Sequence, residues 1–313
     1  MARDVATVFG GSGFIGRHVV QRLAGSGYTV RVAGRDTALA ARLRPMGRVG
    51  QVVPVYGAFG DDASLAECVA GARVVVNLVG ILAERRRGDF DRIHHRAAGR
   101  IAELAAASGT ERLVQVSAIG ADPASPSRYG RSKAAGERAV TAAFPPAAIV
   151  RPSIVFGPGD DFFNRFASMA RLLPVMPVVS GATRLAPVYV GDVADAIAEL
   201  TAPGHPPGIW ELGGPEVLTM RELLGWIVRQ TGRSRPLVGV PAAVAKFQAA
   251  VLGLLPNPPL TSDQLAMLSR DNVPTAGAPG LAALGITPTP IEAVVPRYLE
   301  RFRKPGTQVQ VPV

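Results

Sequence analysis

The sequence has one cysteine, Cys68, among 313 residues. A single thiol excludes an internal disulfide framework, suits a reducing compartment and is expected to be a small apolar residue on a helix. Long uncharged apolar runs are also missing, so no segment is expected to cross a membrane. The nearest approach, residues 238–255, is interrupted by Pro241, Lys246 and Gln248. We interpret it as a lid or core helix, with a segment lying on a bilayer or in a partner's groove as the alternative.

Acidic residues are too few to balance the basic ones, and the net charge is +10. The excess belongs to residues 1–155, with 21 Lys and Arg against 12 Asp and Glu, whereas residues 156–313 have 13 against 12. A basic surface attracts nucleic acid, anionic lipid, an anionic cofactor or an acidic partner. Zinc-finger spacing and an aromatic-rich RNA-binding signature are missing, so we expect neither nucleic acid nor a metal. An anionic cofactor with a partner or membrane surface fits the charge better.

Short apolar runs alternate with helical stretches through the first half of the chain. "VATVF", "YTVRVA" and "ARVVVNLV" are such runs, and segments of helical length follow them. The alternation predicts parallel strands joined by crossover helices that cover both faces of one sheet. The predicted fold class is α/β, a doubly wound parallel sheet (Rossmann fold) with a smaller, mostly helical C-terminal cap. We expect a nucleotide-binding domain over residues 1–155, with 186–214 returning to its sheet, and a smaller substrate- or partner-facing region over 156–313.

A glycine-rich turn lies between the first predicted strand and helix. "VFGGSGFIG" places Gly10, Gly13 and Gly16 in the pattern G-x-x-G-x-x-G. Gly10 permits the tight turn, Gly13 lets the backbone approach a pyrophosphate, and Gly16 lets helix and strand pack closely. The pyrophosphate would lie at the positive N-terminus of the helix. The residues of this turn predicted to bind a dinucleotide are Gly10, Ser12, Gly13, Phe14, Ile15 and Gly16.

The end of the second predicted strand discriminates between two dinucleotides. NAD-binding domains usually have an Asp or Glu there, which bonds the ribose 2′-hydroxyl. Here Gly34 takes that position and Arg35 follows. A guanidinium pairs with a 2′-phosphate that an acid would repel. We therefore expect NADP(H), with NAD(H) as the alternative, and expect Asp36 to face solvent or cap the next helix.

The chain has five tyrosines and three lysines, and one of each, Tyr129 and Lys133, has i, i+4 spacing. That spacing puts both on one helix face, and Ser117, which ends a predicted strand, is expected at the same edge of the sheet. A nearby ammonium lowers a phenol pKa that is ordinarily near 10. The set predicts that Ser117 orients a carbonyl, that Tyr129 exchanges a proton with its oxygen as hydride moves, and that Lys133 also bonds the ribose. An ordinary amphipathic helix is the alternative.

Together these segments resemble the extended and atypical branch of the short-chain dehydrogenase/reductase superfamily. The likeness rests on "GGSGFIG", Ser117, "YGRSK" and "RPSIVFGPGD" and covers most of the chain. It implies that Pro152 and Ser153, after the sixth strand, line the nicotinamide end. It also implies that the turn after the fourth strand lies beside the cofactor, with Asn77, Leu78 and Val79.

Longer segments resemble the NAD(P)H-binding accessory subunits of respiratory complex I and their bacterial relatives. "AFPPAAIVRPSIVFGPGDDFFNRFASMA", "PVYVGDVADAI" and "PPLTSDQ" carry this likeness. It implies a tightly held NADPH, little or no turnover, and complex I subunits as partners at the membrane surface. The protein would be cytoplasmic or peripheral on the inner face of the membrane.

Two other functions compete with this one. An active NADPH-dependent reductase or epimerase/dehydratase, acting on a small carbonyl or nucleotide-linked substrate, is favoured by the complete set of Ser117, Tyr129 and Lys133. A redox-sensing NADP-binding regulator would be expected to lack the tyrosine. Sugar-nucleotide epimerases of the extended branch often have a substrate-contacting Asn where this chain has Pro152-Ser153-Ile154. Arg184 resembles the arginine that holds a nucleotide diphosphate in those enzymes, with a surface or structural arginine as the alternative.

Overall fold

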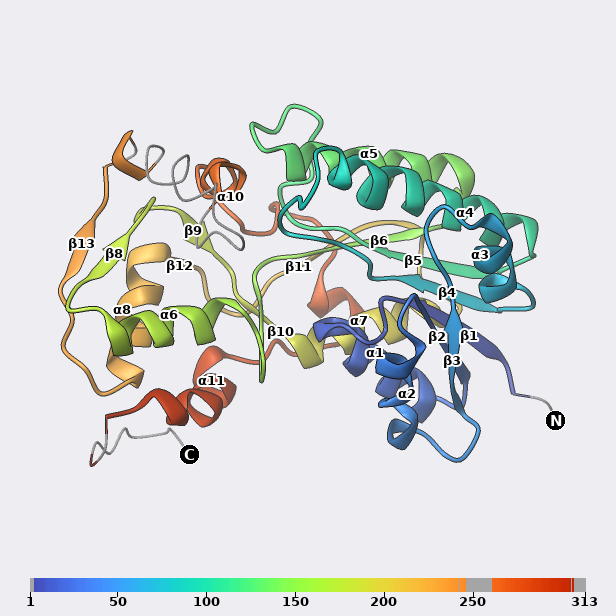
Figure 1. Cartoon of the computed structure of the whole chain (residues 1–313), viewed down its shortest axis with the longest axis horizontal. Helices are drawn as coiled ribbons and strands as arrows, with labels where there is room; N and C mark the ends of the chain where they lie inside the picture. The colour runs from blue at the N-terminus through green and yellow to red at the C-terminus, as the bar shows by residue number, and fades with distance from the viewer. Residues whose placement is uncertain (1–2, 242, 246–260, 305, 307–313) are drawn as a thin grey trace.

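The computed structural model describes residues 3–241, 243–245, 261–304 and 306. A parallel sheet with helices on both faces forms one end of the molecule, and a smaller cap forms the other (Figure 1). No helix in these described ranges is long and apolar enough to span a membrane. Of the apolar stretch 238–255, residues 242 and 246–255 lie outside the described residues.

Seven parallel strands form the main sheet, in the order β11-β6-β5-β4-β1-β2-β3. The valine-rich runs predicted from the sequence form most of them, because β-branched side chains suit a sheet buried on both faces. The strand order reverses between β1 and β4, which is where doubly wound sheets bind their ligands. The strands are β1 (Val5–Phe9), β2 (Thr29–Gly34), β3 (Val52–Tyr56), β4 (Val74–Asn77), β5 (Arg112–Val116), β6 (Ala148–Pro152) and β11 (Gly208–Leu212).

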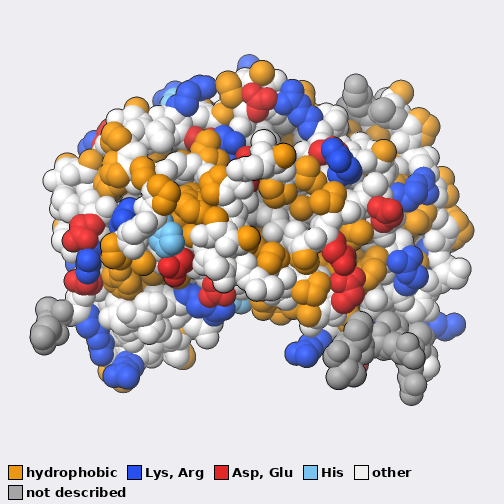
Figure 2. Space-filling view, turned by 180° about the vertical axis from the view of Figure 1, so that it is seen from behind, with side chains coloured by type: hydrophobic (Ala, Val, Ile, Leu, Met, Phe, Trp, Pro, Cys, Tyr) orange, Lys and Arg blue, Asp and Glu red, His pale blue; other side chains and the backbone are white. Residues whose placement is uncertain are grey.

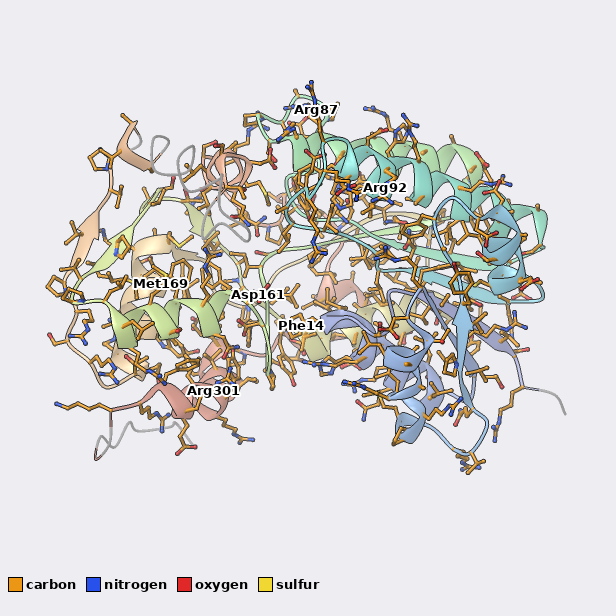
Figure 3. The ribbon with its side chains drawn as sticks, in the orientation of Figure 1. Phe14, Arg87, Arg92, Asp161, Met169 and Arg301 are labelled. Atoms are coloured by element: carbon orange, nitrogen blue, oxygen red, sulfur yellow. The ribbon has the colours of Figure 1, made fainter. Side chains whose placement is uncertain are left out.

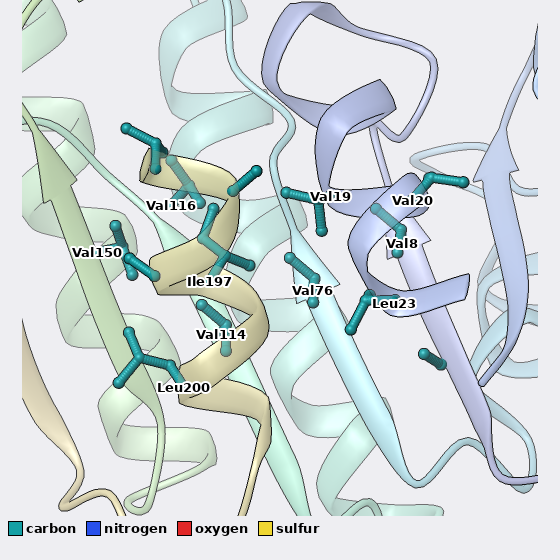
Figure 4. Packing of buried hydrophobic residues seen from close by; sticks show 14 of the residues in the cluster. Val8, Val19, Val20, Leu23, Val76, Val114, Val116, Val150, Ile197 and Leu200 are labelled. Atoms are coloured by element: carbon teal, nitrogen blue, oxygen red, sulfur yellow. The ribbon is translucent and has the colours of Figure 1, made fainter. Parts of the chain in front are cut away.

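Helices cover both faces of this sheet, which confirms the doubly wound fold. The helices are α1 (Phe14–Gly25), α2 (Thr37–Ala41), α3 (Asp62–Val69), α4 (Ala97–Ala107), α5 (Arg128–Ala143) and α7 (Val190–Thr201). On one face, Leu23 of α1 and Ile197 of α7 pack against valines of the central strands (Figure 4). On the other face, buried residues of α3, α4 and α5 cover side chains that include Phe9 and Ile149. Cys68 lies buried in this second core, and burial raises the pKa of its thiol to about 11.

Residues 186–214, which are expected to return to the sheet, contain one strand that extends the main sheet and one that does not. β11 does extend the main sheet through parallel pairing with β6. The segment around Val188 instead forms β10 (Val188–Tyr189), which pairs with β7 (Val155–Phe156) outside the main sheet. Two features keep it short: Pro187 lacks a backbone donor, and α7 begins at Val190.

The described part of the cap contains four helices and two small sheets around its own core. Its helices are α6 (Phe162–Leu172), α8 (Met220–Gln230), α10 (Ser262–Met267) and α11 (Ile291–Leu299). Its strands are β8 (Met176–Val178) paired with β13 (Leu237–Gly239), and β9 (Arg184–Leu185) paired with β12 (Leu218–Thr219). At the junction with the sheet domain, a Cβ on Gly157 would lie 3.6 Å from the Phe14 ring; Figure 3 labels Phe14 and Asp161, the N-cap of α6, at this junction. There the Arg17 guanidinium donates to the Pro158 carbonyl oxygen at 2.5 Å.

Candidate functional site

The glycine turn has the geometry that its spacing predicts. Gly10 has φ +75°, and a Cβ there would lie 3.3 Å from the Leu78 carbonyl carbon and the Val79 amide nitrogen. A Cβ on Gly16 would lie 2.2 Å from the Gly10 carbonyl oxygen, so only glycine lets α1 pack this closely on the turn. The turn after β1 and the turn after β4 therefore meet at the point where the strand order reverses.

The N-terminus of α1 fits the phosphates of a dinucleotide. Its N-cap is Gly13, which is exposed and has no side chain to cap the helix, and the first turn contains no acidic residue. The Gly13 amide donates to the Gly10 carbonyl oxygen at 3.0 Å, and the next amide bonded to the turn is that of Arg17. Helix amides without a side-chain cap and the positive end of the helix dipole form a site for an anion.

Arg35 and Asp36 follow β2 and have different surroundings. Asp36 caps α2 by accepting a hydrogen bond from the Leu39 amide at 2.9 Å, as one of its two expected roles required. The Arg35 side chain is exposed, and no ion pair or hydrogen bond joins it to any described residue. A guanidinium with no partner among the described residues therefore lies at the position where the ribose 2′ substituent is recognised in this fold.

The turn after β4 is held by the side chain of Asn77. Its amide nitrogen donates to Gln115 Oε1 at 2.8 Å, and its Oδ1 accepts from the Val79 amide at 3.1 Å. Asn77 is buried, and its hydrogen bonds lie within the protein. In this structure it shapes the turn, and Leu78 and Val79 are the residues that face Gly10.

Tyr129 and Lys133 lie together on one face of α5, and both are buried. Lys133 Nζ lies 5.9 Å from the centre of the Tyr129 ring and donates to the Val116 carbonyl oxygen at 3.2 Å. Burial lowers the pKa of Lys133 to about 8, an effect that the nearby Glu137 partly opposes. Burial also raises the pKa of Tyr129 above its ordinary value. The expected lowering of the Tyr129 pKa by the ammonium is thus wrong for this structure, because desolvation of the phenolate dominates.

Ser117 follows β5, next to the carbonyl that Lys133 contacts. Its amide donates to the Val150 carbonyl oxygen at 2.7 Å. Its Oγ is buried and has no hydrogen-bond partner within the described part of the chain. A buried hydroxyl without a partner is costly, so this atom fits a site completed by a ligand oxygen.

His94 belongs to the same cluster, and sequence analysis missed it. It lies in a π-helix (Asp91–Arg96) and stacks on Phe90, and its ring lies at a T-shaped angle to that of Tyr129, with the two ring centroids 5.3 Å apart. Its Nε2 accepts from the Ile81 amide at 3.0 Å, so the proton is on Nδ1, which donates to Ser132 Oγ at 2.8 Å. Burial, and then the charge of Lys133, lower the pKa of His94 to about 3, so the ring is neutral at pH 7.

The close approach that brings His94 to α5 depends on a glycine. A Cβ on Gly136 would lie 1.9 Å from the His94 carbonyl oxygen. The π-helix and this glycine have no periodic signal in the sequence, because each is defined by the neighbouring element. Together they set the distance between the aromatic ring of His94 and Tyr129.

Pro152, the last residue of β6, and Ser153 join the sheet to the cap. The Pro152 carbonyl oxygen accepts from the Ile119 amide at 3.1 Å. Ser153 Oγ contacts the backbone oxygen of Asn272 at 2.8 Å and its Oδ1 at 2.7 Å. Asn272 was not anticipated, since 119 residues separate it from Ser153.

Arg184 has a partner of its own in the cap. Its Nε donates to Asp271 Oδ2 at 2.8 Å, and its amide donates to Asp271 Oδ1 at 2.8 Å. The side chain is 61% exposed. Among the described residues, the polar contacts of the Arg184 side chain thus join it to Asp271 rather than to Tyr129, Lys133 or Ser117.

The sequence profile of the NAD dependent epimerase/dehydratase family matches residues 6–213, which include the glycine turn, Tyr129 and Lys133. The chain belongs to that family. Members carry an NAD(P)-binding Rossmann fold, which agrees with the sheet order and the glycine turn. Within the described ranges, no group of three or more His, Cys, Asp or Glu is arranged to hold a metal ion.

Mitochondrial relatives match almost the whole length of this family member, and a bacterial reductase matches part of it. The mitochondrial NADH dehydrogenase [ubiquinone] 1 alpha subcomplex subunit 9 of Dictyostelium discoideum is 34% identical over 96% of this chain and 85% of its own length. The subunit of the same name from Arabidopsis thaliana is 36% identical over 96% of this chain and 79% of its own. A ceramide reductase of Caulobacter vibrioides is 38% identical over 62% of this chain and 59% of its own.

Solved structures of low sequence identity share the fold. Triphenylmethane reductase from Citrobacter sp. has a TM-score of 0.76 at 19% identity and covers 95% of this chain and 99% of its own. The NADPH-dependent quinone oxidoreductase from Escherichia coli in complex with NADPH has a TM-score of 0.73 at 17% identity and covers 95% and 99%.

Proposed function

We propose that this family member holds NADP(H) tightly and acts as an accessory protein of the respiratory complex I type, with little or no turnover. The uncommitted Arg35 guanidinium after β2, where an NAD-binding domain has an acid, is the observation that carries the NADP(H) preference. Likeness to the two mitochondrial subunits over 96% of the chain supports the accessory role.

The residues that would hold the dinucleotide come from two turns at the carboxyl edge of the sheet and from helix α5. The α1 N-terminus and Gly13 would bind the pyrophosphate, and Arg35 would pair with the 2′-phosphate. Lys133 has donors left after its bond to Val116 and would bond the nicotinamide ribose. A bound NADP(H) would supply hydride transfer at Ser117 and Tyr129.

An exposed apolar surface at the far end of the cap supports a position beside a membrane. Leu172, Leu173 and Val175 lead into β8, and Val238 lies on the paired strand β13; all four are exposed. We call these four residues the cap tip.

Residues 162–180 and 220–245 around the cap tip contain six arginines and one acidic residue. Figure 2 shows basic side chains next to hydrophobic ones at this end of the molecule, on the right of that view. Apolar side chains framed by arginines suit an anionic bilayer surface, on its inner face in this proposal.

Co-migration with complex I tests the accessory role. The full chain, tagged at its C-terminus, is expressed from its own locus, and detergent-solubilised membranes are separated on a native gel. The tag should migrate with NADH dehydrogenase activity. A tag found only in the soluble fraction, with complex I assembled normally in its absence, would rule out the accessory role.

A second function, reduction of a lipophilic carbonyl, is favoured by the orphan Ser117 hydroxyl and by likeness to the ceramide reductase. Burial raises the pKa of Tyr129, so the phenol keeps its proton at neutral pH, and its donation would depend on the neighbouring Lys133 ammonium. Ser117 would hold the carbonyl oxygen, hydride from NADPH would reach the carbonyl carbon, and Tyr129 would protonate the oxygen, yielding an alcohol and NADP⁺. Lys133 would stabilise the resulting phenolate.

Turnover of carbonyl compounds distinguishes the two functions. Purified protein with NADPH is offered long-chain ketones and sphingoid ketones, and oxidation of NADPH is followed by absorbance. Turnover that Tyr129→Phe abolishes while NADPH still binds would establish a reductase. NADPH that stays reduced with every compound agrees with the accessory role.

A further inference from the structure

Residues 261–272, which we call the clamp segment, join the cap to the candidate site. On the cap side, Thr183 Oγ1 donates to the Leu268 carbonyl oxygen at 2.6 Å, and Arg184 pairs with Asp271. On the other side, the side-chain hydrogen bonds between this segment and the described part of the sheet domain lie near Ser117, Tyr129 or Ser153.

Asp263 makes the most extensive of these contacts, at the N-terminus of α5. Its Oδ1 accepts from the Arg128 amide at 2.6 Å, and its Oδ2 accepts from the Tyr129 amide at 3.1 Å and from Ser127 Oγ at 2.8 Å. Ser127 Oγ in turn accepts from the Gly130 amide at 3.2 Å. The first three amides of α5 are therefore satisfied, two of them by a carboxylate 134 or more residues away.

The carboxylate that caps the N-terminus of α5 comes from outside that helix. The first turn of α5 has no acidic residue of its own, so Asp263 is the carboxylate that meets its positive end. The clamp segment is ordered independently at the same place, because Thr261 and Gln264 form a reciprocal capping box at the start of α10. One short stretch thus caps two helices, and Asp263 stands between their N-termini.

We propose that Asp263 is a positioning residue for Tyr129: it fixes the first turn of α5 and so sets where the phenol lies beside Lys133 and His94. The remaining clamp contacts act on the neighbouring loops. Arg270 donates to Asp122 Oδ2 at 2.7 Å, and the Asn272 side-chain amide donates to the Ile119 carbonyl oxygen at 3.3 Å, both in the loop that follows Ser117. The C-terminal cap domain therefore fixes the positions of Tyr129 and of the loop after Ser117, whether or not the cofactor turns over.

Hydrogen exchange and a tyrosine probe test this role in the full chain. Asp263→Asn keeps one acceptor but cannot accept all three bonds, and Asp263→Ala keeps none. Both should speed exchange of the Arg128, Tyr129 and Gly130 amides, by roughly five- to tenfold for the alanine, as expected for a lost helix cap. With fluorotyrosine incorporated, the ¹⁹F resonance assigned to Tyr129 through Tyr129→Phe should shift or broaden while the other four stay in place.

Asp271→Ala is the matched control, because it removes an ion pair of the same segment that does not touch α5. It should leave the exchange of those amides and the Tyr129 resonance unchanged. If the Asp263 variants leave exchange and resonance as in the wild type, Asp263 does not position Tyr129. The same conclusion follows if Asp271→Ala changes them equally. Both readouts are made without substrate or partner, so they are independent of the proposed accessory role.

Discussion

The Nζ atom of Lys133 lies over the ring of Tyr129, 5.9 Å from its centre, and both side chains are buried. In this arrangement burial opposes charge on both groups: the pKa of Lys133 falls to about 8, and that of Tyr129 rises. At neutral pH Lys133 therefore stays largely protonated while Tyr129 keeps its proton, and a bound anionic dinucleotide would favour the ammonium further.

The lowered pKa of Lys133 predicts how stability depends on pH. Between pH 8 and about 10.4 the unfolded chain keeps a lysine proton that the folded chain has lost, so this group makes folding more favourable as the pH rises, by at most ~1.4 kcal/mol per pH unit. In urea unfolding of the cofactor-free protein at pH 7.5 to 10, the free energy of unfolding of the wild type should rise relative to that of Lys133→Met across this window.

The comparison with a variant is needed because Cys68, whose pKa is raised to about 11, titrates with the opposite effect on stability. That effect is common to wild type and variant and cancels in the difference. Lys304→Met, at an exposed lysine, is the control. Its free energy of unfolding, plotted against pH, should run parallel to that of the wild type. Curves for wild type and Lys133→Met that also run parallel would mean that Lys133 is charged throughout.

Arg35→Ala should weaken NADPH far more than NADH, by roughly ten- to a hundredfold, the loss expected for a charge-assisted pair with phosphate. Isothermal titration of the cofactor-free protein with each nucleotide measures it. Arg42→Ala removes another exposed arginine just after α2 and should change neither affinity. Equal losses of affinity for NADPH and NADH in Arg35→Ala would contradict the assignment of Arg35 to the 2′-phosphate.

Gly13→Val should abolish nucleotide binding while the protein stays folded. Gly13 has φ −76°, which valine tolerates, and a Cβ there would lie 3.2 Å from the Gly10 carbonyl oxygen, on the surface that a pyrophosphate would contact. Circular dichroism checks the fold, and fluorescence of added NADPH measures binding. Gly25→Ala, where nothing lies within 4 Å, is the control and should bind normally. Normal binding by Gly13→Val would remove the glycine turn from the site.

The cap tip predicts binding to anionic vesicles. Leu172→Ser combined with Val238→Ser should lower the fraction that sediments with phosphatidylglycerol vesicles, and salt should weaken binding of the wild type because arginines contribute. Val49→Ser changes a fully exposed valine in the sheet domain and should bind as wild type does. Equal sedimentation of all three proteins would contradict a membrane contact at the tip.

Much of the sheet domain was predictable because its signals are local. Valine-rich runs, the glycine turn and the i, i+4 spacing of Tyr129 and Lys133 each lie within a few neighbouring residues, and the structure contains those strands, that turn and that helix. The capping role of Asp36 is also a local signal, because the amide that it caps, that of Leu39, lies only three residues further along the chain.

What could not be predicted depends on contacts between distant segments. Asp263 reaches α5, and Asn272 reaches Ser153, across more than a hundred residues. His94 joins the site only because a π-helix turns it there and Gly136 admits it. The raised pKa of Tyr129 follows from burial, which spacing along a helix does not reveal.

Nucleotide retention tests the central claim most directly. The protein is purified without added cofactor and denatured, the released nucleotide is identified and quantified, and exchange of the native complex against labelled NADPH is timed. A tightly bound NADP(H) predicts close to one NADPH per chain, exchanging over hours. An empty site, bound NAD(H), or exchange within seconds would contradict it.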